Sequence, residues 1–140
     1  MDIHSVLADH RSKNKKGDLP LKNSAGDDRP TTSEIPDIFF DNILTTYKLN
    51  RVETLVLMYL YRRVWCKPNL YKIFGISPML SLSEMSKHLQ VSIEDIYTAL
   101  RNIEGYGFIS TIRSGQYFVR KYFTREWDER FSQTYDDFEI

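Results

Sequence analysis

The sequence predicts a mainly α-helical domain that ends in a small β-hairpin. Apolar residues recur at spacings of three and four in several segments, which is the pattern of helices with a buried face. Two of these segments begin with a serine that is followed three residues later by an acidic residue, a pattern typical of helix N-termini. Residues 108–123 then alternate around Ser114 and Gly115, as two strands joined by a tight turn do.

Length and composition exclude several classes of protein. The chain has 140 residues, enough for one domain with a modest core. Its 19 basic and 19 acidic side chains cancel, so any attraction for nucleic acid has to be local. Cys66 is the only cysteine, which excludes an internal disulfide and a zinc site built from several thiolates. No stretch approaches the roughly 18 apolar residues of a membrane span, and the N-terminus lacks the pattern of an export signal. We therefore expect a cytoplasmic protein with no membrane partner.

The distribution of apolar residues predicts three regions. Between residues 11 and 34 the apolar side chains are confined to Leu19, Leu21 and Ala25, too few to offset the entropy of ordering the segment. The regions expected are a disordered N-terminal tail over residues 1–34, a folded domain over 35–123, and a C-terminal amphipathic helix with an acidic tail over 124–140.

The first two helices are expected to pack together. Residues 35–47 read "IPDIFFDNILTTY", in which Pro36 suits a first helical turn. The apolar face of this helix is Phe39, Phe40, Ile43, Leu44 and Tyr47. Residues 50–65, "NRVETLVLMYLYRRVW", are apolar on two sides, so their helix should be central. A loop with proline and glycine breakers follows over 66–80, and the residues expected to pack down from it are Leu70, Tyr71, Ile73 and Phe74.

Two short helices are expected over residues 81–89 and 92–104. Ser81 with Glu84, and Ser92 with Asp95, match the capping box that satisfies free backbone donors at a helix start. Asp95 is interpreted as a cap, and Glu94 as an acid favoured by the helix dipole. The inward residues are Met85 and Leu89 in the first helix and Ile96, Ala99, Leu100 and Ile103 in the second, which Gly105 and Gly107 terminate.

The last segment places aromatic residues three or four positions apart, which predicts a final amphipathic helix carrying Trp127, Phe131, Tyr135 and Phe138. Small domains need apolar area, so we expect this row to cover the domain's own core. The alternative is a seam between two copies, and the sequence leaves a monomer and a homodimer open.

A packed helix pair followed by a hairpin makes a winged helix-turn-helix domain. The segments "IPDIFFDNIL", "ETLVLMYLYRRVW" and "SLSEMSKHLQVSIEDIYTALRNIEGYGFI" resemble the N-terminal domain of bacteriophage replication protein O and of DnaD-like primosome proteins, and more broadly bacterial winged-helix regulators. The resemblance implies a domain that binds double-stranded DNA. The chain departs from DNA-reading members at the start of the second helix of the pair, where they carry Ser, Thr or Arg and this chain has Ile93, Glu94 and Asp95. Gln90 also stands where many relatives have glycine.

The first functional hypothesis is a DNA-binding transcriptional regulator or replication-associated factor. Helix 92–104 would enter the major groove, and the basic hairpin 108–123 would contact the DNA backbone. The residues expected at that interface are Ile93, Tyr97, Thr98, Arg101, Asn102, Arg113, Ser114, Gln116, Arg120 and Lys121.

The second hypothesis is a non-catalytic winged-helix module that binds another protein through the same helix or its flexible tails. Its contact residues would be Glu94, Asp95, Tyr97, Trp127 and Phe131. Neither hypothesis requires a cofactor. The chain shows none of the common catalytic motifs and no metal-ligand spacing, so we expect no enzyme activity and no metal site.

Overall fold

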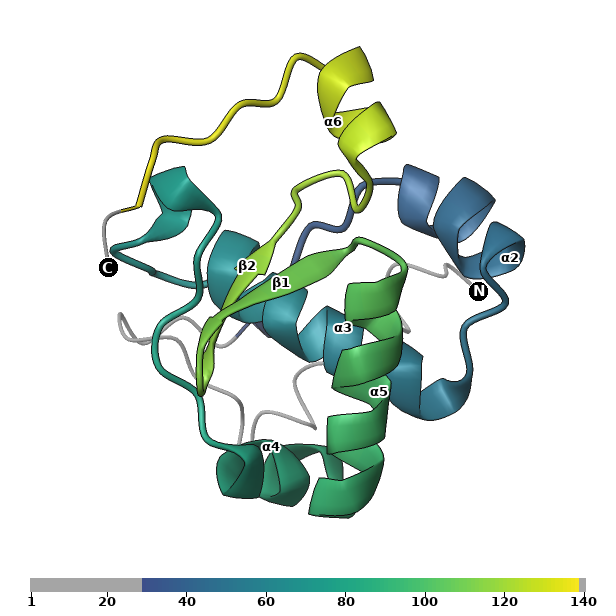
Figure 1. Ribbon diagram of the computed structural model, residues 1–140, viewed down its shortest axis with the longest axis vertical. Coiled ribbons are helices and arrows are strands. Elements are labelled where there is room, and N and C mark those ends of the chain that lie inside the picture. The colour runs from purple at the N-terminus through teal and green to yellow at the C-terminus, as the bar shows by residue number, and fades with distance from the viewer. Residues whose placement is uncertain (1–28, 139–140) are drawn as a thin grey trace, which may run out of the picture. The chain divides into compact units, whose positions relative to one another are not determined.

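The computed structural model describes residues 29–138, and from Glu34 onward the described chain forms one compact unit (Figure 1). The predicted fold class is confirmed, because the unit is mainly α-helical with a small antiparallel hairpin after the helices, in a winged-helix-like arrangement. Most of the predicted N-terminal tail lies outside the described residues. No helix between residues 29 and 138 is both long and apolar enough to span a bilayer.

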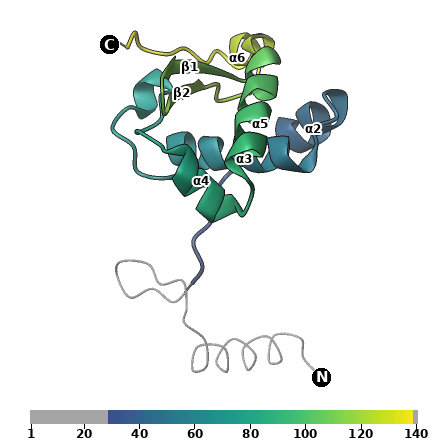
Figure 2. The same cartoon turned by 60° about the horizontal axis from the view of Figure 1, so that its bottom comes forward.

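The helices follow the apolar periodicity, with π-helical turns at two of them. In chain order they are η1 (Phe39–Ile43), α2 (Leu44–Thr46), α3 (Arg51–Tyr61), η2 (Arg62–Cys66), η3 (Lys72–Phe74), α4 (Leu82–Leu89), α5 (Ile93–Gly105) and α6 (Arg125–Arg130). Helix α3 is the central element, as predicted, and its Val56, Leu57 and Leu60 are fully buried. Helices α4 and α5 pack against it (Figure 2). The interior positions of α5 are likewise buried.

The predicted serine caps are confirmed at both helices of the pair. The Ser81 hydroxyl accepts a hydrogen bond from the Glu84 N–H at 3.0 Å, and the Ser92 hydroxyl accepts one from the Asp95 N–H at 3.1 Å. The cap of α5 is therefore Ser92, and the interpretation of Asp95 as a cap is wrong, because its side chain is exposed and accepts no return bond from the Ser92 N–H. Gln90 ends α4 with a φ of 55°, in the left-handed region where glycine has the lowest cost.

The hairpin consists of β1 (Ile109–Arg113) and β2 (Gln116–Val119), paired from Ile109 opposite Val119 to Arg113 opposite Gln116. Residues 75–80 run along the other edge of β2, which the sequence did not predict. The Ser77 N–H donates to the Tyr117 carbonyl at 2.8 Å, and the Leu80 N–H donates to the Gly115 carbonyl at 2.7 Å. β2 is thus held from both sides, and the hairpin is fixed to the segment that leads into α4.

Some apolar residues are less buried than their spacing predicted. Phe40 is exposed on the outside of η1, where it packs edge-on against the buried Phe39. Of the four loop residues expected to pack down, Leu70 and Ile73 are exposed, so the expectation is wrong at these two. In that loop Phe74 is half-buried, and its ring lies 5.3 Å from that of Phe138.

The predicted C-terminal helix is much shorter than its aromatic spacing suggested. α6 ends at Arg130, and Ser132 has a left-handed φ of 59°, which a continuing helix does not allow. The four aromatic residues consequently go to different places. Trp127 packs on the core, Phe131 stacks on Trp127, Tyr135 contacts Phe118, and Phe138 contacts Tyr71 and Phe74.

This division predicts unequal effects of two aromatic substitutions. Trp127→Ala should lower the free energy of unfolding by about 2 to 3 kcal/mol, because it removes a large side chain from the edge of the core. Phe131→Ala should cost less than about 1 kcal/mol, since that ring is 46% exposed. Urea unfolding at two protein concentrations measures both changes. Equal losses would contradict this division, and wild-type midpoints that shift with protein concentration would show that the row belongs to a dimer seam.

Candidate functional site

A groove of about 980 Å³ lies between the start of α4, the solvent-facing side of α5 and the hairpin. We call it the α5–hairpin groove. Its apolar lining includes Met79, Leu82, Tyr97, Leu100 and Tyr117, and its charged lining includes Glu84, Arg101 and Glu104. The groove occupies the region that a winged-helix domain would present to DNA.

The side chains of α5 divide according to the helical period. Ile96 and Ile103 face α3 and are buried, so Ile93, Tyr97 and Arg101, spaced by four, lie along the exposed side. The Tyr97 ring is 53% exposed, and the Arg101 guanidinium carbon lies 5.8 Å from its centroid. α5 thus presents an aromatic and aliphatic strip with one cation.

Two other α5 residues predicted to contact DNA are engaged within the chain. The Asn102 amide donates to the Glu53 carboxylate at 2.8 Å. Glu53 is buried at the start of α3, where it also accepts the Asn50 N–H and completes a reciprocal capping box. The Thr98 hydroxyl donates to the Glu94 carbonyl at 3.1 Å. Asn102 therefore ties α5 to α3, a contact that no local sequence pattern signals.

The hairpin tip exposes two of the predicted residues and buries a third. Arg113 and Ser114 are exposed. Gln116 is only 2% exposed, and its amide donates to the Ser77 carbonyl at 3.0 Å. Gln116 therefore holds the hairpin to the 75–80 segment and does not face outward.

The two remaining hairpin cations make contacts within the chain, Arg120 with α6 and Lys121 with η2. An Arg120 guanidinium nitrogen lies 3.1 Å from an oxygen of the buried Asp128, and the Arg120 side chain is 19% exposed. The Lys121 ammonium lies 5.6 Å from the Trp65 ring centroid. Arg120 is therefore paired with an acid, Lys121 keeps its charge while it packs on an aromatic ring, and Arg113 is the exposed cation of the three.

Asp128 is a structural centre that the sequence did not indicate. Its carboxylate accepts the Tyr122 N–H at 3.0 Å, the Arg120 guanidinium at 3.1 Å and the Tyr135 hydroxyl at 2.7 Å. Burial raises the pKa of Tyr135, and the hydrogen bond to Asp128 raises it further, so the phenol stays neutral and donates. These bonds hold the segment after α6 against the hairpin.

The exposed charged side chains around the groove are mixed in sign. The exposed charged side chains of α4, α5 and the two strands are four acids, Glu84, Glu94, Asp95 and Glu104, and three cations, Lys87, Arg101 and Arg113. Glu104 additionally accepts the Thr111 N–H at 2.9 Å. Of these charged side chains, Glu84, Glu104 and Arg101 line the groove, whose own lining therefore carries two acids and one cation.

No protein-family model, curated protein or solved structure matches this chain. A function therefore has to be inferred from the geometry and charge of the site. Within residues 29–138 no group of three or more His, Cys, Asp or Glu side chains is placed to hold a metal ion.

Proposed function

We propose that the chain is a non-catalytic winged-helix module that binds a segment of another protein in the α5–hairpin groove. The observation that carries the proposal is the exposure of large apolar side chains along a groove that bears acids. Met79 is 59% exposed and Tyr97 is 53% exposed, and both line the groove. Exposed apolar patches with polar surroundings are typical of protein-binding surfaces, and tyrosine is among the residues that contribute most to such interfaces.

The charges define the chemistry of the partner. Glu84 and Glu104 line the groove, and Glu94 lies on the exposed side of the same helix. Acids around an apolar strip favour a partner segment in which large apolar side chains are flanked by Lys or Arg. Arg101 adds a donor for a backbone carbonyl or an acid of that segment.

DNA binding is a second candidate, as a transcriptional regulator or replication-associated factor. It is favoured by the winged-helix-like arrangement, by the exposure of Arg101 and Arg113, and by the sequence resemblance to the N-terminal domain of replication protein O and DnaD-like primosome proteins. Phosphate contacts supply most of the affinity for DNA, and they need cations that outnumber acids at the interface. Four exposed acids against three cations is the reverse, which places the protein-binding function first.

Selection from a displayed library of random peptides tests the proposal. Peptides enriched on the protein are expected to combine large apolar residues with Lys or Arg. Tyr97→Ala should weaken their binding at least tenfold, or about 1.4 kcal/mol, because it removes an exposed anchor. Glu84→Gln should weaken binding less, by removing one rim charge.

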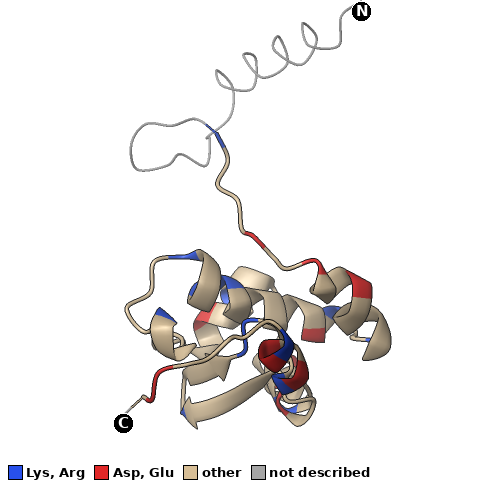
Figure 3. Cartoon of the chain, turned by 90° about the horizontal axis from the view of Figure 1, so that it is seen from above, with Lys and Arg blue, Asp and Glu red and all other residues tan. Residues whose placement is uncertain are grey.

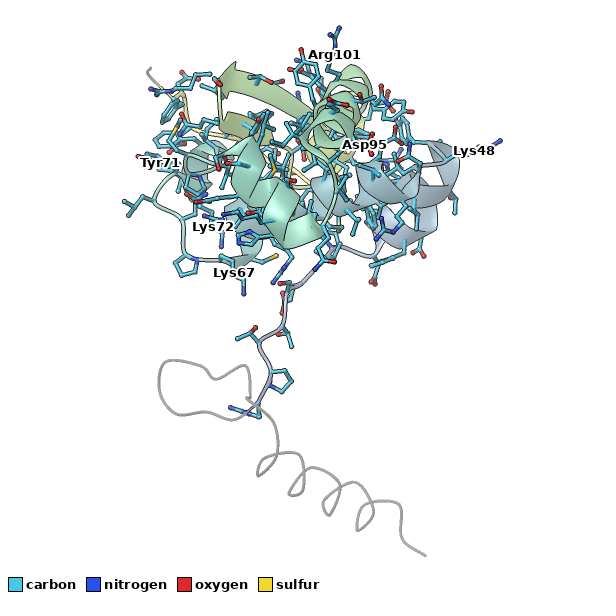
Figure 4. The ribbon with its side chains drawn as sticks, turned by 90° about the horizontal axis from the view of Figure 1, so that it is seen from below. Lys48, Lys67, Tyr71, Lys72, Asp95 and Arg101 are labelled. Carbon is cyan, nitrogen blue, oxygen red and sulfur yellow. The ribbon has the colours of Figure 1, made fainter. Side chains whose placement is uncertain are left out.

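Lys48→Gln is the matched control, because Lys48 is exposed at a place remote from Arg101 (Figure 4). It should bind the enriched peptides like the wild type. Enriched peptides that are acidic, or whose binding is the same in Tyr97→Ala and in the wild type, would contradict the proposed groove.

A further inference from the structure

The end of α3 forms a second surface with a different charge. The helix widens there into the π-turn η2, in which the Lys67 N–H donates to the Arg62 carbonyl five residues earlier, at 2.9 Å. π-turns of this kind frequently occur at functional sites. Here the turn gathers Arg62, Arg63 and Lys67 on one short stretch, and Figure 3 shows Lys and Arg at the end of α3, in η2 and in the loop that follows.

These cations border a hollow of about 260 Å³ between the end of α3, η2 and the end of α4. The residues that line it are Tyr59, Arg62, Arg63, Lys67, His88 and Leu89. Among the described residues that form its wall there is no acidic side chain. Three permanent cations and a histidine thus meet at one small concave site.

The cations keep their capacity to bind a ligand. The side chains of Arg63 and Lys67 make no hydrogen bond or ion pair with any residue in the range 29–138. Arg62 already takes part in another interaction, so the inference rests on Arg63, Lys67 and His88. Arg63 and Lys67 are both half-buried and both line the hollow.

His88 is oriented by a neighbouring hydroxyl. The Tyr59 hydroxyl lies 2.9 Å from Nδ1 of His88, and Tyr59 itself is buried in α3. When the hydroxyl donates to Nδ1, the ring proton of the neutral imidazole is on Nε2, which is then a donor for a ligand. The contact with Tyr59 thus positions the ring and occupies Nδ1, so that Nε2 is the nitrogen left for a ligand.

We infer that this hollow binds a phosphate group. Arg63 supplies planar paired donors, Lys67 a compact positive charge, and His88 a further N–H, and together they match the acceptor oxygens of a phosphate. The hollow is separate from the α5–hairpin groove, because Lys67 and Lys72 point from one side of the molecule and Arg101 from the other (Figure 4). The site is therefore additional to the proposed function and does not depend on it. The phosphate belongs either to a free phosphate compound or to a nucleic-acid backbone.

Chemical-shift titration of the isotope-labelled full chain tests the inference. Inorganic phosphate is added at constant ionic strength, with sodium chloride as the reference, and a short mixed-sequence DNA duplex is titrated separately. Saturable shifts are expected around Arg63, Lys67 and His88. Arg63→Gln and Lys67→Gln should each weaken binding about tenfold, the effect of losing one charge-assisted contact.

Lys48→Gln is again the control and should leave the titration unchanged, while urea unfolding checks that each variant keeps its fold. If the duplex saturates the same residues at a concentration at least tenfold lower than inorganic phosphate does, the ligand is a nucleic-acid backbone. Saturation by phosphate alone assigns a free phosphate compound. Shifts that chloride reproduces, that do not saturate, or that persist in both glutamine variants would overturn the site.

Discussion

Replacing Asp128 with alanine is expected to lower the free energy of unfolding by about 3 to 5 kcal/mol, the range for removing one partner of a buried ion pair. Asp128 is 2% exposed and receives hydrogen bonds from Tyr122, Arg120 and Tyr135. Its removal leaves a half-buried backbone N–H and a half-buried guanidinium without their acceptor. Urea unfolding of the variant measures the loss.

Tyr135→Phe is the matched control for this prediction. It deletes one hydroxyl donor to Asp128 and leaves the ion pair with Arg120, so it should cost only about 1 kcal/mol. The account of Asp128 is wrong if its alanine variant loses no more stability than Tyr135→Phe does.

Replacing Gly115 with alanine is expected to cost about 2 to 4 kcal/mol, through backbone strain and a steric clash. Gly115 has a φ of +85°, and a Cβ atom built on it would lie 2.7 Å from the Leu80 carbonyl oxygen. Relief of that clash requires the hairpin tip to move away from the 75–80 segment, which also breaks the hydrogen bond from the Leu80 N–H to Gly115. Because Leu80 and Gly115 both line the α5–hairpin groove, peptide binding should fall together with stability.

Ser114→Ala serves as the control at the neighbouring position of the same turn. Ser114 is exposed, so its variant should unfold within about 0.5 kcal/mol of the wild type. A Gly115→Ala variant as stable as Ser114→Ala would show that the tip is not fixed against Leu80.

The sequence predicted those parts of the fold that local patterns determine. The apolar faces of α3 and α5, the serine caps at Ser81 and Ser92, and the turn at residues 114–115 each depend on residues a few positions apart. The pairing of residues 75–80 with the outer edge of β2 was missed, because it joins residues about forty positions apart. The short α6 was missed because its aromatic spacing imitates a longer helix, and contacts of Tyr135 and Phe138 with distant segments override it.

The sequence predicted which residues lie near the candidate site, but not which of them are free to contact a partner. Tyr97, Arg101 and Arg113 are exposed, as their positions suggested. Arg120 and Asn102 looked equally available from the sequence, yet each binds a buried acid. Asp128 follows Arg120 by eight residues, and Glu53 precedes Asn102 by 49. Sequence shows how many cations a hairpin carries, whereas only the fold shows which of them are already neutralised.

The most direct test of the central claim, that the α5–hairpin face binds protein and does not read DNA, is a chemical-shift titration of the labelled chain with a mixed-sequence DNA duplex at low salt. The account predicts that the amides of residues 93–105 and 111–115 keep their positions, and that Arg101→Glu and Arg113→Glu leave any duplex binding unchanged. Saturable shifts in those amides that both charge reversals abolish, with a salt dependence reduced by about one unit per lost phosphate contact, would contradict it.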